Sequence, residues 1–256
     1  MNGQRIAGCA VISALWLIAA PLHAQTADEL VAKNLAARGG ADKLAAITTY
    51  QTRGTVRLPG DFRLTFDETR SRLDPATDLC AVRVDMAIQG LTLIQAYDGT
   101  SGWRVNPFEG RKDPEKIGVD DARALADEAL IDGALLASRA RGSKIEYMGR
   151  EDVDGTDAYK LRVNQADGTV FTYFLDPDAY LEIKVIERRT IRGAEQETET
   201  DLSDYERVAG VYFPFSIASG PVNAKDQQVI TVKTAEANVT VSPATFAMPS
   251  VPAKTQ

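Results

Sequence analysis

The sequence predicts a mainly β chain with additional helices (α+β). We expect a single strongly curved antiparallel sheet that forms an incomplete β-barrel, with helices covering its concave face. Three observations support this expectation: apolar and polar residues alternate with a period of two in several segments, short turns connect these segments, and one long apolar helical stretch interrupts them. Strands that are joined by short turns pair with their neighbours in an antiparallel arrangement.

The first predicted element is a helix from Thr26 to Arg38, in which apolar residues recur near helical spacing. Gly39 and Gly40 follow it, and glycine readily adopts the backbone conformation that ends a helix. A second, shorter helix is expected over residues 41–46.

The period then changes to two, which is typical of strands with one buried and one solvated face. Turn signals separate these strands, and counting by the pattern gives about ten or eleven of them. One of these turns, Asp154-Gly155, lies in an acidic segment that lacks the glycine spacing of a calcium loop, so a hairpin turn is favoured there. The clearest alternating segments are 62–66, 82–88, 159–163 and 181–185.

A helix is predicted over residues 119–141, where Asp120 and Asp121 open the segment and basic residues close it. Gly133 weakens its middle, because glycine is a poor helix former. The apolar surface of this segment is wide, so we expect the helix to lie against the concave face of the sheet. Residues 106–116 are predicted to form a loop, and the acidic residues 195–201 an exposed strand that resists edge-to-edge pairing.

Residues 1–24 are predicted to be a cleavable signal peptide, with a basic first region, an apolar run and Ala24 at the cleavage position. We therefore expect a periplasmic protein with one domain over residues 25–250 and an irregular tail over 251–256. Loss of Arg5 with the leader reduces 29 basic residues to 28, against 36 acidic residues, for a net charge of −8. This charge argues against nucleic acid as a partner.

The only histidine, His23, lies in the predicted leader, and the expected mature chain keeps one cysteine, Cys80. Such a chain has no Ser-His-Asp triad, no Cys-His dyad and no histidine-based metal site. We therefore expect a protein that is not an enzyme and that uses neither a metal nor another cofactor.

Several motifs, in this order and spacing, resemble the outer-membrane lipoprotein-sorting-like proteins of the LolA/LolB superfamily. The resemblance implies an incomplete β-barrel of the LolA/LolB half-barrel type over residues 25–250, with a helical lid over a hollow that holds acyl chains. No local motif marks the arginine that gates the lid in this family, although Arg63 and Arg104 are both placed on predicted strands. The motifs are Leu30-Val31, Gly39 to Leu44, Gly54, Tyr97 to Trp103, Asp204 to Glu206, Gly210 to Pro214, Asn238, Phe246 and Pro249.

The resemblance implies a periplasmic carrier or chaperone for lipids or lipoproteins. Its partners would be their acyl chains, an inner-membrane donor and an outer-membrane acceptor. We expect the apolar residues of the alternating strands and of the lid to line the cavity, although ordinary core packing explains the same pattern. The predicted lipid-binding residues are Phe62, Leu64, Phe66, Val82, Val84, Met86, Leu91, Leu93, Trp103, Val105, Leu125, Leu130, Leu135, Leu136, Tyr147, Leu161, Phe171, Tyr173 and Ile183.

Two alternatives from other functional classes remain open at this point. The first is an envelope hydrolase that uses paired carboxylates, for which Asp67-Glu68 and the acidic run 195–201 supply candidates. The second is a sensor or scaffold that binds a protein partner through the sheet edge or the lid. A hydrolase predicts two carboxylates that face each other in a polar cleft, and a scaffold predicts a filled core.

Overall fold

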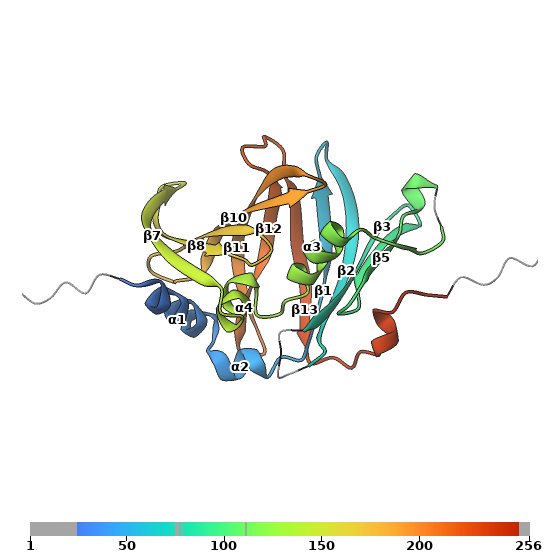
Figure 1. Ribbon diagram of the computed structural model, residues 1–256. Helices are drawn as coiled ribbons and strands as arrows, with labels where there is room; N and C mark the ends of the chain where they lie inside the picture. The colour runs from blue at the N-terminus through green and yellow to red at the C-terminus, as the bar shows by residue number, and fades with distance from the viewer. Residues whose placement is uncertain (1–24, 75–76, 78, 111, 251–256) are drawn as a thin grey trace, which may run out of the picture.

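The computed structural model of the chain describes residues 25–250, apart from residues 75, 76, 78 and 111. The predicted signal peptide, 1–24, and the predicted tail, 251–256, lie outside the described residues. Within them, the chain forms mainly β structure with a few helices, as the alternating pattern predicts (Figure 1).

The described strands form one antiparallel sheet of 13 strands, in the order β6-β5-β4-β3-β2-β1-β13-β12-β11-β10-β9-β8-β7. Most neighbours in the sheet are also neighbours in sequence, as short turns dictate, and β13 returns to pair with β1. The strands are β1 Thr49–Leu58, β2 Phe62–Arg72, β3 Cys80–Ile88, β4 Leu91–Tyr97, β5 Gly102–Val105, β6 Glu115–Lys116, β7 Lys144–Val153, β8 Thr156–Asn164, β9 Val170–Leu175, β10 Glu182–Ile191, β11 Ala194–Val208, β12 Val211–Pro221 and β13 Gln228–Ala237.

The sheet is open and is not strongly curled, which corrects the expectation of an incomplete barrel. Its two outermost strands, β6 and β7, have no pairing with each other, because the ladder runs in a single row with β1 and β13 near its middle. The acidic strand β11 is half exposed, as predicted, but it is not an edge strand. Its acidic residues instead lie opposite basic residues of β10, in pairs such as Lys184 with Asp201.

The first helix agrees with the prediction, whereas the predicted helix over 119–141 is in fact two helices. Thr26 caps α1 through a reciprocal capping box with Glu29. Gly133 has a φ of 80°, outside the helical range, and therefore separates α3 from α4. The helices are α1 Ala27–Arg38, α2 Ala41–Ala45, α3 Val119–Glu128 and α4 Ala134–Ala140, with 3₁₀ turns at η1 Pro107–Glu109 and η2 Pro243–Thr245.

Helices α1, α3 and α4 lie on the same side of the sheet, which we call the helix face (Figure 1). Strand residues alternate between the two sides, so Val82 and Val84 of β3 face α3 while Arg83 and Asp85 face away from it. The opposite face carries charged pairs such as Arg53 with Asp67. This alternation places the apolar residues on the helix face.

Three apolar clusters on the helix face position the candidate site. The α1–α4 cluster combines helix and strand residues, the α3 cluster joins that helix to β3, and all members of the sheet cluster come from strands. The α1–α4 cluster comprises Leu30, Val31, Leu135, Leu161, Val163, Phe171, Tyr173 and Leu175; the α3 cluster comprises Cys80, Val82, Val84, Leu125 and Ala129; the sheet cluster comprises Val56, Leu64, Phe66, Phe215 and Val232.

Candidate functional site

Most of the predicted lipid-binding residues lie on the helix face, distributed over the three clusters. Leu64, Phe66 and Met86 belong to or pack against the sheet cluster, and Leu93 lies directly opposite Met86 on the neighbouring strand. Leu130 is buried between α3 and α4. The members near the α3 cluster are Val82, Val84 and Leu125, and those in or against the α1–α4 cluster are Leu135, Leu136, Tyr147, Leu161, Phe171 and Tyr173.

Phe62, Leu91 and Ile183 are less enclosed than the rest of the predicted set. Phe62 and Leu91 are 65% and 42% exposed and lie beside the turns of two neighbouring hairpins, β1–β2 and β3–β4. Ile183 is half-buried at an irregularity in the pairing of β10 with β9. The two hairpin residues therefore extend the apolar helix face to solvent at one end of the sheet.

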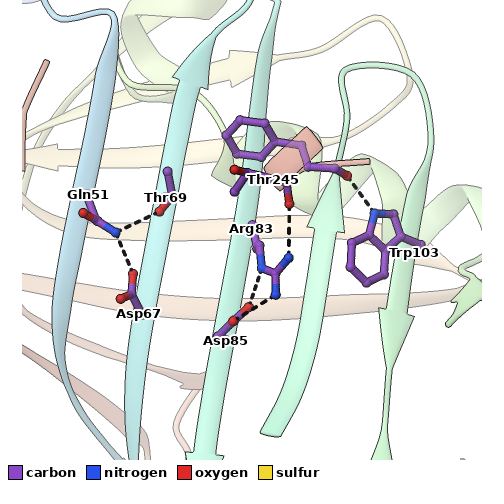
Figure 2. A network of polar contacts seen from close by, with 8 residues as sticks. Gln51, Asp67, Thr69, Arg83, Asp85, Trp103 and Thr245 are labelled. Carbon is purple, nitrogen blue, oxygen red and sulfur yellow. Dashed lines mark hydrogen bonds and ion pairs between the residues drawn. The ribbon is translucent and has the colours of Figure 1, made fainter. Parts of the chain in front are cut away.

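Trp103 and Val105 do not join the other predicted residues, because they project from the opposite face. Trp103 pairs with Ala96, which in turn pairs with Arg83, and all three lie on that face. Its indole Nε1 donates to the carbonyl oxygen of Phe246 at 2.7 Å. Figure 2 shows this contact beside the Arg83–Asp85 pair, so Trp103 anchors the C-terminal segment to the sheet.

Ion pairs hold the α3–α4 segment, residues 119–140, across the helix face. Arg189 of β10 contacts Asp127 of α3 at 2.5 Å, and the side chain of this arginine is only 7% exposed. Arg72 of β2 forms a two-pronged contact with Asp132, at 2.6 and 3.3 Å, in the link between the two helices. Arg38 of α1 also donates to the backbone oxygen of Asp132. Arginines from β10, β2 and α1 thus hold this segment in place on the helix face.

A polar group composed of Glu68, Arg70 and Glu128 lies where α3 ends over β2. Arg70 pairs with Glu68 on the sheet. Desolvation, reinforced by the negative charge of Glu68 and opposed by Arg70, raises the pKa of Glu128 to about 7. Glu128 still contacts solvent, which places it at the water boundary of the helix face and not in the packed core.

The paired carboxylates suggested by the sequence do not meet in space. Asp67 and Glu68 point to opposite faces, where they pair with Arg53 and Arg70 respectively. On the opposite face Asp67 also accepts from Gln51 at 3.1 Å, as Figure 2 shows. The carboxylate that does interact with Glu68 is Glu128, which is distant in sequence and carried by α3.

Two grooves occur outside these clusters. One of about 420 Å³ lies near the β3–β4 hairpin turn, where Thr55, Thr65 and Ala87 line it from the opposite face of the sheet, and one of about 300 Å³ lies between α3 and two other hairpins. Over residues 25–250, outside the four undescribed positions, no group of three or more possible metal ligands occurs. In the same part of the chain, the helices are too short or too polar to cross a membrane.

Comparisons with known structures support the fold assignment. A DUF1329 family protein from Desulfovibrio piger superposes with a TM-score of 0.60 at 14% identity, over 85% of this chain and 96% of that one. A LolA superfamily protein from Nitrosomonas europaea gives 0.57 at 12% identity, over 88% and 98%. The chain has a LolA-like fold.

The same fold occurs in a putative outer membrane lipoprotein-sorting protein domain from Vibrio parahaemolyticus, with a TM-score of 0.57 at 10% identity over 85% of this chain and 94% of that one. No family model and no curated protein sequence matches the chain. The LolA-like architecture agrees with the resemblance noted in the sequence, and identities this low establish the fold alone.

Sequence reasoning missed the arginines that contact the α3–α4 segment. They are Arg38, Arg72 and Arg189, whereas the two arginines considered from the sequence, Arg63 and Arg104, pair elsewhere, with Asp61 and Glu115. Arg189 and Asp127 lie 62 positions apart, so no local pattern links them.

Proposed function

We propose that this LolA-like chain is a periplasmic carrier, without enzymatic activity, that binds the acyl chains of lipids or lipoproteins for transport through the cell envelope. The observation that carries the proposal is the helix face, where three apolar clusters lie beside a helical segment that ion pairs help to hold in place. The predicted leader supports the compartment, and the shared fold supports the class of function.

Burial against apolar side chains would stabilise a bound acyl chain. Each methylene group transferred from water contributes about 0.8 kcal/mol, so a chain of about twelve carbons contributes roughly 10 kcal/mol before the entropic costs of binding. We propose the sheet cluster as the principal contact, because its members come only from strands and an acyl chain does not have to displace a helix to reach them. The exposed Phe62 and Leu91 would form the entrance.

The attachment of α3 suggests how the site opens. Leu125 and Ala129 hold one side of the helix to β3 by apolar contact, whereas Asp127 holds the other side to β10 through Arg189. Water can replace the partner of an ion pair, but it cannot replace an apolar contact without cost. We therefore propose that α3 stays with β3 and swings away from β10 when a ligand enters or leaves.

Substitution of Asp127→Asn tests this opening. We expect faster amide hydrogen exchange in α3 and faster association of a fluorescent fatty acid, with exchange in α1 unchanged. Glu195→Gln provides the matched control, since it removes one carboxylate from the exposed Arg188–Glu195 pair on the opposite face. Equal exchange in α3 for both variants would contradict the proposed motion.

Lipid extraction tests the function itself. The full chain is expressed with its leader in a Gram-negative host, purified without detergent, and extracted with organic solvent for mass spectrometry. We expect co-purifying acyl lipids and displacement of a bound fluorescent fatty acid by unlabelled fatty acid. A protein that neither carries lipid nor binds the probe would rule the carrier function out.

One observation favours the alternative of an envelope hydrolase. Desolvation and the negative charge of Glu68 raise the pKa of Glu128 to about 7 against the opposing charge of Arg70, and a raised carboxyl pKa beside a second carboxylate is a pattern of acid–base catalysis. A panel of chromogenic glycosides and esters tests it. Hydrolysis that is lost in Glu128→Gln would support this alternative, and a panel without any turnover would remove it.

A further inference from the structure

A polar cleft of about 300 Å³ lies on the helix face where α3 begins. It forms between the first turns of α3 and two hairpin turns, β8–β9 and β10–β11. Its surface is polar, unlike the clusters described above. Its lining includes the side chains of Asp120, Arg123, Asp167, Thr169 and Arg189.

Arg189 lines this cleft with a hydrogen-bond donor that is not satisfied. Its side chain is 7% exposed, and two of its nitrogens contact Asp127 and Glu187 at 2.5 Å each. The third nitrogen, Nη1, is buried and receives no hydrogen-bond acceptor from the described residues. Buried donors are nearly always paired in folded proteins, so this atom indicates that the cleft receives an acceptor from outside the chain.

The charges around the cleft restrict the class of ligand that can supply this acceptor. Asp120 and Asp167 balance Arg123 and Arg189 in the lining, and Asp127 and Glu187 add negative charge just behind it. An anionic ligand would therefore meet net repulsion. A simple cation such as a trimethylammonium group has no oxygen to offer to Nη1 of Arg189. A neutral group that both donates and accepts hydrogen bonds satisfies both conditions.

The two carboxylates keep the capacity to accept further hydrogen bonds. Asp120 accepts from the backbone nitrogen of Arg192 at 3.1 Å, and Asp167 accepts from that of Thr169 at 2.9 Å. A carboxylate has about four acceptor positions, so each of them can accept a ligand hydroxyl as well. Burial alone would raise the pKa of Asp167, but the bonds from Thr169 and the charge of Arg189 outweigh it and lower the pKa. Asp167 therefore stays an acceptor at neutral pH.

The cleft adjoins the apolar part of the helix face. On β9, Phe171 of the α1–α4 cluster lies directly opposite Glu187, the partner of Arg189. The hydroxyl of Tyr173, two residues along the same strand, is also buried without a hydrogen-bond partner among the described residues. The polar cleft and apolar residues of the helix face are thus carried by the same two neighbouring strands, β9 and β10.

We propose that this cleft binds the uncharged, hydroxyl-rich headgroup of an amphiphile, such as a sugar, whose acyl chain lies on the apolar helix face. The hydroxyl oxygens accept from Arg189 and Arg123, and the hydroxyl hydrogens are donated to Asp120 and Asp167. This inference rests on the proposed carrier function, and it specifies the class of lipid that the carrier selects.

Calorimetric titration of the full-length protein tests the proposal with four ligands below their micellar concentrations: dodecyl maltoside, dodecyl phosphate, dodecyltrimethylammonium and maltose. We expect dodecyl maltoside to bind at least about tenfold more tightly than either charged amphiphile, and maltose to bind more weakly than dodecyl maltoside. Arg123→Ala should lower the affinity for dodecyl maltoside about threefold to tenfold. It should not lower the affinity for dodecyl phosphate. These changes correspond to the loss of one or two hydrogen bonds.

The variants keep the test interpretable. Arg123 is about half exposed, so its removal leaves the fold intact, whereas Arg189→Ala risks misfolding and is used only with a circular dichroism check. Arg188→Ala, on the opposite face, is the matched control and should bind all four ligands as the unaltered chain does.

The outcomes separate the two proposals. Binding of none of the amphiphiles would overturn the carrier function together with this inference. Equal binding of all three amphiphiles, unchanged in Arg123→Ala, would overturn the headgroup site and leave the carrier function standing. Preference for the cationic amphiphile would overturn the uncharged class. Maltose binding as tightly as dodecyl maltoside would overturn an amphiphile headgroup in favour of a free sugar.

Discussion

The α1–α4 cluster and the sheet cluster are both apolar and both lie on the helix face, but different partners bury them. Leu161 and Val163 of the first are covered by helix residues such as Leu30 and Leu135 and are fully buried. Leu64 and Phe215 of the second pack only against other strand residues and retain 8% exposure each. Under the proposed carrier function, the source of the covering residues, and not burial alone, distinguishes the structural core from the binding surface.

The largest expected effect is on the α1–α4 cluster. Leu161→Ala removes a side chain with 0% exposure that helices and neighbouring strands enclose. The rigid surroundings cannot collapse around the cavity, so we expect a loss of about 3–5 kcal/mol in the free energy of unfolding, measured with urea. Folded Leu161→Ala should bind a fluorescent fatty acid as the unaltered chain does. Weakened binding at full folding would place the ligand under the helices instead.

The same substitution in the sheet cluster should have a smaller effect on stability and a larger effect on binding. Leu64→Ala removes the same atoms from a residue whose cluster contains strand residues only, without a helix residue. We expect about 2 kcal/mol of destabilisation by urea unfolding, because neighbouring strand residues can fill part of the space. Fatty-acid affinity should fall about tenfold, as the contact of one side chain with the acyl chain is lost. Unchanged affinity would remove the sheet cluster from the proposed site.

Trp103 extends the comparison to the opposite face. Trp103→Phe keeps most of the buried ring area and removes the hydrogen bond from Nε1 to the carbonyl oxygen of Phe246. That leaves a buried acceptor without its partner, so we expect about 1 kcal/mol of destabilisation by urea unfolding. Fatty-acid binding should not change, and a clear loss of affinity would show that the opposite face takes part in binding.

The sequence predicted those features that depend on local patterns. Alternation of apolar and polar residues identified the strands, and apolar residues at helical spacing followed by Gly39 and Gly40 identified α1 within one residue. Gly133 was recognised as a weak point, yet its φ of 80° makes it a break between two helices. Trp103 alternates like any other strand residue, and only the pairing of the whole sheet shows which face it occupies.

The ion pairs that hold the α3–α4 segment could not be predicted from local sequence patterns, because their partners are far apart in the sequence. Asp132 and Arg72 are 60 positions apart, and neither stands in a motif. Their pairing depends on how α3 lies across the sheet. That position depends in turn on Leu125, which packs in the α3 cluster, and on Ile131, which packs in a further buried cluster with Tyr50 and Val211. Apolar packing therefore determines the position of the segment first, and the ion pairs follow from that position.

The smallest expected effect is a pH dependence that arises from Glu128, at the boundary between the two kinds of cluster. Its pKa is raised from 4.5 to about 7 in the folded chain, so the folded state holds the proton more tightly than the unfolded state does. Stability from this group is present at acidic pH and is lost as the pH rises through the folded pKa.

Urea unfolding at about pH 5 and about pH 8 measures this contribution in the unaltered chain and in Glu128→Gln. The unaltered chain should lose more stability between the two pH values than the variant does, because glutamine cannot ionise. The difference should be modest, since water reaches Glu128 and screens its charge. Glu151→Gln, on the edge strand β7, controls for the loss of one carboxylate. An identical pH dependence in the unaltered chain and Glu128→Gln would mean that α3 does not hold this carboxyl beside Glu68, and the polar boundary between the clusters would then be open to solvent.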